Sequence, residues 1–293
     1  MFENVITNTS KIIIGNTDRI KLALAAISSE GSILIEDYPG SGKTTFAKAL
    51  TLNLGLNFKR IQFTSDLLPS DILGFNVLSN DKINFQQGPI FTNIVLADEL
   101  NRGSPKSQSA FLEAMEEKKV SIDGESHSLP EPFFVIATQN PMDTSGTSSL
   151  PDSQLDRFMI SYSLSELSEN DKINMLKQDV DLTKGKTSHL DWDEIKIKRN
   201  KITVKEEIYK YVLEIEQVIK TLEQKIYISA RCMKQIINQA KGWAIINGKD
   251  YVTHQDIKDT LPFILRHRIR FLNQEDKFEF VNKEILEKIS IIG

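Results

Sequence analysis

Residues 33–44 constrain the fold more than any other stretch of this chain. They read Ile-Leu-Ile-Glu-Asp-Tyr-Pro-Gly-Ser-Gly-Lys-Thr, an apolar run, a glycine-containing turn and the start of a helix. This order is typical of a phosphate-binding loop, where backbone N–H groups and a helix N-terminus surround an anion. Lys43 would reach the β- and γ-phosphates of a nucleotide, and Thr44 would offer its hydroxyl to Mg²⁺.

One position departs from the usual pattern of such loops. Asp37 stands where G-x-x-x-x-G-K-[ST] has its first glycine. The alternative is therefore an ordinary glycine-rich turn that precedes a helix. We favour the phosphate loop because the flanking strand and helix are both present. The residues expected to contact the phosphates are Pro39, Gly40, Ser41, Gly42, Lys43, Thr44 and Thr45.

A second buried run, Ile94-Val95-Leu96-Ala97, ends in two adjacent acids, Asp98 and Glu99. Ligands of open parallel sheets bind at the carboxyl ends of the strands, so we expect this pair beside the phosphate loop. Asp98 would hold the Mg²⁺ and Glu99 would polarise the attacking water. The alternative is a solvated strand end.

A third apolar run, residues 133–137, leads to Asn140. At the same sheet edge this amide could orient the lytic water or contact the γ-phosphate. Before Pro141 it could equally be a turn residue.

Composition excludes several classes of protein. The formal charge is −4, which does not indicate a broad basic surface for binding nucleic acid. Cys232 is the only cysteine, so no intrachain disulfide forms, which fits a reducing compartment. The amino terminus has no signal-peptide pattern, and no apolar run approaches the ~20 residues of a membrane span. We therefore expect a cytoplasmic protein without membrane insertion. The four histidines are scattered, which makes a zinc site unlikely.

Two hairpins are expected outside the central sheet. Residues 75–85 alternate between apolar and polar side chains around a polar turn. Residues 119–129 turn at Asp123-Gly124, which is a strong signal for a two-residue turn. The first hairpin lies in a segment too long for an ordinary connection, and such insertions are often functional.

From about residue 165 the pattern becomes helical. This change predicts a nucleotide-binding α/β core over residues 1–164 and an all-helical part over 165–293. In the second part, residues 203–206 have the form of a capping box. The basic and polar residues 184–201 are expected to form a loop around Trp192, and Pro262 to interrupt the last helix.

Two arginines stand out as candidates for contact with a nucleotide. Arg157 lies near the end of a short helix expected over residues 151–158, where an arginine usually makes a surface ion pair of little energetic value. The sharper hypothesis is an arginine finger offered to the nucleotide of a neighbouring subunit. Arg231 lies in the first turn of the helix capped by Ser229, a poor place for a cation because the helix dipole is positive there. An anionic partner such as a nucleotide phosphate would explain Arg231, and a solvated side chain is the alternative.

The order of these motifs resembles that of the MoxR family of AAA+ ATPases over nearly the whole chain. An acid in the place of the first loop glycine is familiar in that family. The resemblance is carried by residues 36–44, 60–64, 66–71, 88–91, 97–102, 137–141, 155–158 and 265–268.

The resemblance implies a P-loop AAA+ core with a five-stranded parallel sheet flanked by helices, followed by a helical lid. It implies that residues 71–91 are a helix-2 insert and that 119–129 are the hairpin before sensor 1. By the same resemblance, Asn140 is sensor 1, Arg157 is a finger acting in trans and Arg231 is sensor 2. The Ser-Ala-Arg at 229–231 varies a common Ser-Pro-Arg pattern. Ile14-Gly15 corresponds to the segment beside the adenine, although a strand end that only packs is equally compatible with the residues.

Such proteins use ATP and Mg²⁺, assemble as homo-oligomeric rings that are commonly hexamers, and act as chaperone-like remodelling factors. Their partners often carry a von Willebrand factor A domain. The alternatives from the sequence are a magnesium-chelatase-like subunit, a DNA-associated AAA+ motor, and a nucleotide-gated scaffold that barely turns over.

Overall fold

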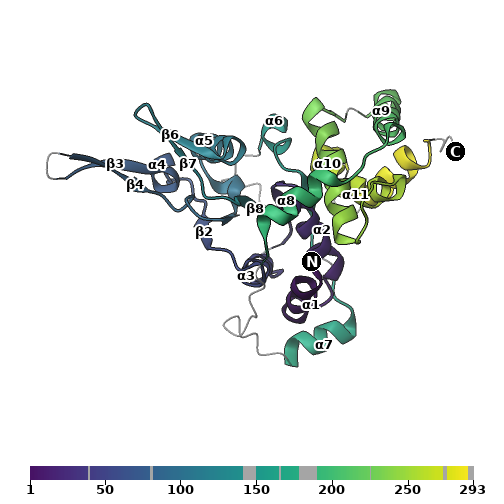
Figure 1. The fold of residues 1–293 in the computed structure, drawn as a ribbon, viewed down its shortest axis with the longest axis horizontal. Coiled ribbons are helices and arrows are strands. Elements are labelled where there is room, and N and C mark those ends of the chain that lie inside the picture. The colour runs from purple at the N-terminus through teal and green to yellow at the C-terminus, as the bar shows by residue number, and fades with distance from the viewer. Residues whose placement is uncertain are drawn as a thin grey trace.

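The computed structural model of the protein describes residues 1–38, 40–79, 82–140, 150–164, 166–177, 190–224, 226–272 and 276–289. A five-stranded parallel sheet with the strand order β2-β5-β8-β1-β9 lies at its centre (Figure 1), which confirms the predicted fold class. Its strands are β1 (Ile33–Glu36), β2 (Phe58–Gln62), β5 (Ile94–Asp98), β8 (Phe134–Gln139) and β9 (Ile160–Tyr162).

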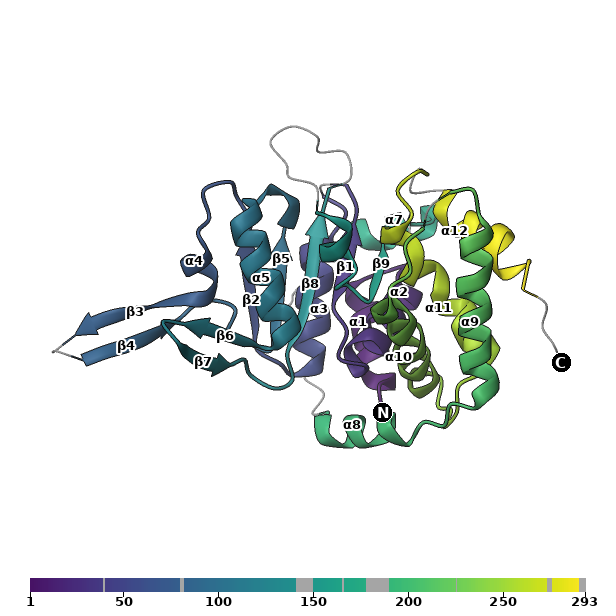
Figure 2. The ribbon, with the colours of Figure 1, turned by 90° about the horizontal axis from the view of Figure 1, so that it is seen from above.

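The inner strands are apolar because helices cover both faces of the sheet. Alternate strand residues enter two separate clusters: Ile33 and Ile35 join one, and Leu34 joins the other. The first cluster includes side chains of α3 (Lys43–Leu54), and the second includes those of α5 (Pro105–Glu117). Figure 2 shows these two helices on opposite sides of the strands. The sheet is thus the middle layer of three.

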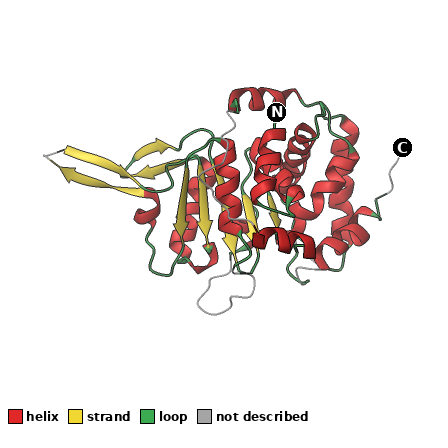
Figure 3. Cartoon of the chain, turned by 90° about the horizontal axis from the view of Figure 1, so that it is seen from below, coloured by secondary structure: helices red, strands yellow, loops and turns green. Residues whose placement is uncertain are grey.

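Both predicted hairpins are confirmed. They are formed by β3 (Gly74–Ser79) with β4 (Lys82–Gln87) and by β6 (Lys119–Ile122) with β7 (Glu125–Ser128). Asp123 and Gly124 both have positive φ, 50° and 87°, as a two-residue turn of this hand requires. The hairpins project together from one end of the molecule (Figure 3). Asn76 Nδ2 donates a hydrogen bond of 2.7 Å to Asp123 Oδ2 and so joins them.

The remaining secondary-structure elements of the described chain are helical. The short α4 (Pro69–Leu73) precedes the first hairpin, and a 3₁₀ turn (Leu100–Arg102) follows β5. The other elements are α1 (Glu3–Ile12), α2 (Thr17–Ser28), α6 (Asp152–Leu155), α7 (Glu169–Lys177), α8 (Trp192–Lys201), α9 (Glu206–Thr221), α10 (Ala230–Ile246), α11 (His254–Leu265), a 3₁₀ turn (Arg266–Arg268), α12 (Asp276–Phe280) and a π-helical turn (Val281–Leu286).

Helix α10 connects the carboxyl-terminal helices to the amino-terminal part of the chain by packing closely on α2. A Cβ atom at Gly242 would collide with the backbone carbonyl of Ala25, so this position has no room for a side chain. Ser29 Oγ donates a hydrogen bond of 2.6 Å to the backbone oxygen of Asn238. Within the described ranges, none of the helices combines the length and apolar character that crossing a bilayer requires.

Two predictions about where helices begin in the carboxyl-terminal part of the chain were wrong. Residues 192–201, expected as part of a loop, form α8, because Asp191 Oδ1 accepts hydrogen bonds of 3.0 Å from the N–H groups of Asp193 and Glu194. Residues 184–189 of the same prediction lie outside the described residues. The capping box at 203–206 is absent: α9 has Lys205 at its N-cap, and Thr203 instead pairs with Tyr251 in a short parallel bridge.

Two further predictions were wrong about where helices end. Helix α11 continues through Pro262 to Leu265. Proline removes a backbone hydrogen bond there, but the fully buried Leu261, Ile264 and Leu265 keep the helix packed on the core. At the amino end, α1 ends at Ile12 and a turn follows, so the strand end considered as an alternative for Ile14 and Gly15 is absent.

Candidate functional site

A cavity of about 340 Å³ at the carboxyl edge of the sheet contains most of the predicted site. Its wall is formed by Gly40, Gly42, Lys43, Thr44, Thr45, Asp98, Glu99, Thr138, Gln139 and Asn140. These residues come from the β1–α3 loop and from the ends of β5 and β8. A larger hollow of about 980 Å³ lies between α2, α11 and the last helices, but the loop takes no part in its wall. The parallel strands therefore bring the loop, the acid pair and Asn140 together.

The loop has the features of an anion site. Gly40 and Gly42 have φ values of 80° and 91°, which L-residues with side chains rarely adopt. Helix α3 begins at Lys43 with no side chain capping its first N–H groups. Ser41 Oγ is buried and has no hydrogen-bond partner in the described structure. Uncapped N–H groups, the helix dipole and a free hydroxyl donor together fit the oxygens of a phosphate.

The Lys43 side chain is folded back over the loop. Its ammonium donates hydrogen bonds of 2.9 Å to the backbone oxygen of Asp37 and of 2.6 Å to that of Tyr38. Burial lowers the pKa of Lys43 below its ordinary value, and the carboxylates at the site oppose this shift. A bound phosphate would act in the same direction as those carboxylates and favour the charged ammonium.

Asp37 explains why this loop does not need glycine at its first position. One carboxylate oxygen accepts a hydrogen bond of 2.8 Å from the N–H of Tyr38, and the other accepts one of 3.0 Å from the N–H of Leu164. Asp37 is also absent from the residues with positive φ. The side chain thus ties the start of the loop to the chain that follows β9.

The acid pair after β5 is held by residues of the neighbouring strands. Thr138 Oγ1 donates a hydrogen bond of 2.6 Å to Asp98 and accepts one of 2.9 Å from the N–H of Glu99. Arg60 Nε donates to the other Asp98 oxygen at 2.9 Å. Glu99 has φ 54° and ψ 47°, a left-handed conformation that is strained for a residue with a side chain. The hydroxyl of Thr138 therefore stabilises a backbone turn that the sequence alone disfavours.

The Glu99 carboxylate has two partners of its own. Gln62 Nε2 donates to it at 2.8 Å and Arg102 Nη1 at 3.2 Å. Sequence reasoning missed Gln62, Arg60 and Thr138 as site residues. The available signal was their place on the strands that flank β5, where Gln62 lies in register with Asp98.

The donor chemistry of the site fits Mg²⁺. Thr44 and Asp98 line the same cavity and offer hydroxyl and carboxylate oxygens, the ligands that a hard cation prefers. Among the described residues, no group of three or more His, Cys, Asp or Glu forms a cage for a metal. Mg²⁺ often binds with one or two protein oxygens plus phosphates and waters, so such a cage is not required.

Four predicted nucleotide contacts are not in the cavity wall. Ser41 belongs to the loop, but its buried hydroxyl does not line the cavity. Pro39 lies outside the described residues. Ile14 and Gly15 form the turn after α1, where a Cβ on Gly15 would lie 2.7 Å from the side chain of Leu167. Their contact with a base stays a prediction.

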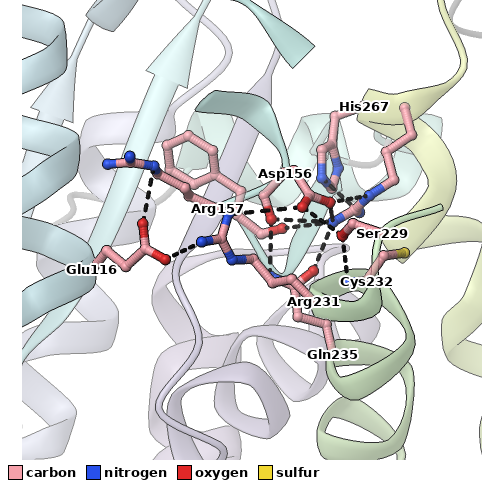
Figure 4. A network of polar contacts seen from close by, with 10 residues as sticks. Glu116, Asp156, Arg157, Ser229, Arg231, Cys232, Gln235 and His267 are labelled. Carbon is pink, nitrogen blue, oxygen red and sulfur yellow. Dashed lines mark hydrogen bonds and ion pairs between the residues drawn. The ribbon is translucent and has the colours of Figure 1, made fainter. Parts of the chain in front are cut away.

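Arg157 and Arg231 lie together, and neither lines the cavity. Arg157 Nε is 3.1 Å from one oxygen of Glu116, and Arg231 Nη2 pairs with the other oxygen (Figure 4). Arg231 Nη1 is also 3.8 Å from Asp156. Arg231 is thus paired with carboxylates of this same chain, and its contact with a nucleotide phosphate stays a prediction.

Asp156 joins α6 to the helices after it. It accepts hydrogen bonds of 2.6 Å from Ser229 Oγ and of 2.9 Å from Arg268 Nη2, and the Arg268 side chain is only 4% exposed. Arg268 also donates to Gln235 Oε1 at 2.6 Å. This network fixes the backbone on which Arg157 stands relative to α10.

Comparison with known proteins gives consistent results. Residues 32–160 match the model of the ATPase family associated with various cellular activities, and 218–289 match the AAA lid domain. YeaC of Bacillus subtilis, which is uncharacterised, is 38% identical over 96% of this chain and 90% of its own length. The chaperone MoxR1 of Mycobacterium tuberculosis is 32% identical over 99% of this chain and 82% of its own. A crystal structure of a candidate ATPase from Cytophaga hutchinsonii superposes with a TM-score of 0.84 at 35% identity, covering 98% of this chain and 94% of that one.

Replacing Thr138 by valine should destabilise the protein by about 1–3 kcal/mol, because it leaves a buried carboxylate oxygen and the N–H of Glu99 without partners. The free energy of unfolding from urea titrations measures the effect. Thr138→Ser keeps the hydroxyl and is the matched control. A valine variant as stable as the serine variant would contradict the role assigned to this hydroxyl.

Proposed function

Because this chain belongs to the MoxR family of AAA+ ATPases, we propose that it binds ATP with Mg²⁺ in the cavity at the sheet edge and hydrolyses it. The observation that carries the proposal is the position of the uncapped loop. Its left-handed glycines, Gly40 and Gly42, line one cavity with the acid pair at the end of β5, and the loop also carries the orphaned Ser41 hydroxyl. This arrangement fits a triphosphate on the loop and a metal beside the acids.

Each residue has a role that its position supports. The N–H groups of the loop and Lys43 hold the phosphates, and Thr44 and Asp98 hold the Mg²⁺. The metal, when bound, offsets negative charge that develops on the phosphate oxygens. Glu99 orients and polarises the attacking water, and Asn140 contacts the γ-phosphate or that water. Gln62 and Arg102 both bind Oε2 of Glu99, and its other oxygen, Oε1, can accept a hydrogen bond from the attacking water.

Replacing Glu99 by glutamine should leave ATP binding within about twofold of wild type and lower turnover by about 10²–10⁴-fold, because it removes the general base and keeps the shape of the side chain. Fluorescent-nucleotide titration and phosphate release measure the two quantities. Glu113→Gln, an exposed position on α5, is the control. Turnover near wild type in the Glu99→Gln protein would contradict the role of Glu99 as general base.

Lys43→Ala should instead lose ATP binding, because Lys43 is proposed to hold the phosphates.

We further propose that Arg157 and Arg231 act on the nucleotide of an adjacent copy in a homo-oligomeric ring, with a hexamer as the expected size. Two facts support this arrangement. Neither arginine lines the cavity of its own subunit. Their side chains are 26% and 41% exposed, so another subunit can reach them. A guanidinium supplied from outside the site stabilises charge in the transition state of phosphoryl transfer.

Mixed assemblies test the shared site. Arg157→Ala and Glu99→Gln proteins should each be inactive alone, whereas a mixture should regain ATPase activity. The active interfaces combine the loop and Glu99 of one variant with the arginine of the other. Steady-state phosphate release at several mixing ratios gives the readout. Mixed assemblies that stay inactive would show that each subunit uses its own arginine.

Hydrolysis would drive chaperone-like remodelling of a protein partner. The support is the family and the name of one relative, a chaperone. The β3–β4 hairpin adds an observation from this chain, because Leu78 and Ile83 face each other across its strands and are each 72% exposed. Exposed apolar side chains gathered at one place mark interaction surfaces. Proteins with a von Willebrand factor A domain are the clients that we propose.

A further inference from the structure

Glu116 lies between the two arginines that are proposed to act on a neighbour. It is on the last turn of α5, while Arg157 follows α6 and Arg231 begins α10. One oxygen of its carboxylate pairs with Arg231 Nη2 and the other lies 3.1 Å from Arg157 Nε (Figure 4). A single carboxylate thus connects three elements that are far apart in the sequence.

We propose that Glu116 is a positioning residue, whose carboxylate holds the guanidinium groups of Arg157 and Arg231 side by side. They then meet the nucleotide of the adjacent subunit as one preformed pair. This inference rests on the proposed function, in which both arginines act across a subunit interface. It adds the residue that keeps two like charges together while no phosphate is near.

The pairing overcomes unfavourable positions on both helices. Arg231 is in the first turn of α10, where the helix dipole disfavours a cation, and Glu116 is in the last turn of α5, where it disfavours an anion. The two guanidinium groups also repel each other. The Glu116 carboxylate lies between them and offsets this repulsion, so each charge depends on the others to stay in place.

The geometry leaves Arg157 ready to bind a second anion. Arg157 contacts Glu116 through Nε. This contact is close enough for an ion pair, but its angles are not those of a hydrogen bond. In the described part of the chain, no hydrogen bond or ion pair joins its two terminal nitrogens. Figure 4 shows that end of the side chain pointing away from the network. These nitrogens form the fork that suits phosphate oxygens.

Asp156 has a different task although it lies close by. Its oxygens accept hydrogen bonds from the buried Arg268 and from Ser229, and its nearest Arg231 nitrogen is 3.8 Å away. The side chain of Asp156 is 9% exposed, whereas that of Glu116 is 32% exposed. Asp156 therefore fixes the scaffold, and Glu116 lies at the surface where a neighbouring subunit would dock.

Glu116→Gln tests the proposal in the full-length assembled protein. Removal of the charge should lower kcat by about tenfold, less than the roughly 10²–10³-fold that loss of a directly stabilising group costs, because Glu116 acts through the arginines. KM for ATP and nucleotide binding should stay unchanged, because the loop is untouched. Glu116→Asp, a shorter carboxylate, should be intermediate. Glu117→Gln is the matched control, since its side chain is 54% exposed and lies 3.7 Å from Lys119 instead.

A double-mutant cycle separates positioning from a structural effect. In an Arg231→Ala background that keeps Arg157 and is measured by single-turnover phosphate release, Glu116→Gln should cause a smaller loss of turnover than in wild type, because half of the pair that it positions is gone. An equal loss in both backgrounds would overturn the proposal, and so would wild-type kcat in Glu116→Gln. Thermal unfolding and sedimentation of each variant confirm that the fold and assembly are intact, and Glu116→Asp carries the test if the glutamine variant does not assemble.

The same variants distinguish a failure of the proposed function from a failure of the role of Glu116. If the wild-type protein hydrolyses no ATP, or if Arg157→Ala is as active as wild type, the proposed function itself fails. If wild type is active, Arg157→Ala is inactive and Glu116→Gln is unaffected, only the role of Glu116 fails.

Discussion

The site depends on the carboxyl ends of β1, β5 and β8 meeting at one edge of the sheet. Parallel pairing in the order β5-β8-β1 makes this unavoidable, because each strand points the same way. The phosphate loop leaves β1, the acids leave β5, and β8 places Thr138 between them. The hydroxyl of Thr138 then links both acids, at 2.6 Å from one side chain and 2.9 Å from the backbone N–H of the other. The strained left-handed backbone of Glu99 is tolerated because hydrogen bonds from its neighbours hold it in this conformation.

The candidate site residues lie in two separate places. The loop and the acids face one cavity, whereas the two arginines are paired with Glu116 outside it. In the proposed mechanism this division would make catalysis depend on assembly, since phosphoryl transfer uses positioning and charge stabilisation more than covalent chemistry. The Asp156–Arg268 pair supports the arrangement by keeping the backbone beside Arg157 fixed to the helical part.

Much of the fold could be predicted from the sequence because its signals are local. Fully apolar runs mark buried parallel strands, and Asp123-Gly124 marks a hairpin. The helices were harder to predict. Helix α8 buries only Ile195 along its length, so it lacks the apolar stripe that would predict a helix. The capping box at 203–206 failed because Thr203 pairs with the distant Tyr251 in an isolated bridge instead.

The loop and the acids of the site follow a local pattern too, whereas the partners that hold them do not. Gln62 reaches Glu99 across 37 residues of chain, and Arg231 reaches Glu116 across 115. The spacing of residues in a single sequence does not predict such long-range contacts. They arise from strand order and from the packing of α10, which become visible only in three dimensions.

The most direct measurement is a structure of the assembled Glu99→Gln protein with ATP and Mg²⁺. The account predicts the triphosphate between the loop of one subunit and both arginines of the next, with the Glu116 carboxylate still beside them. Both arginines at the nucleotide of their own subunit, or far from any nucleotide, would contradict it.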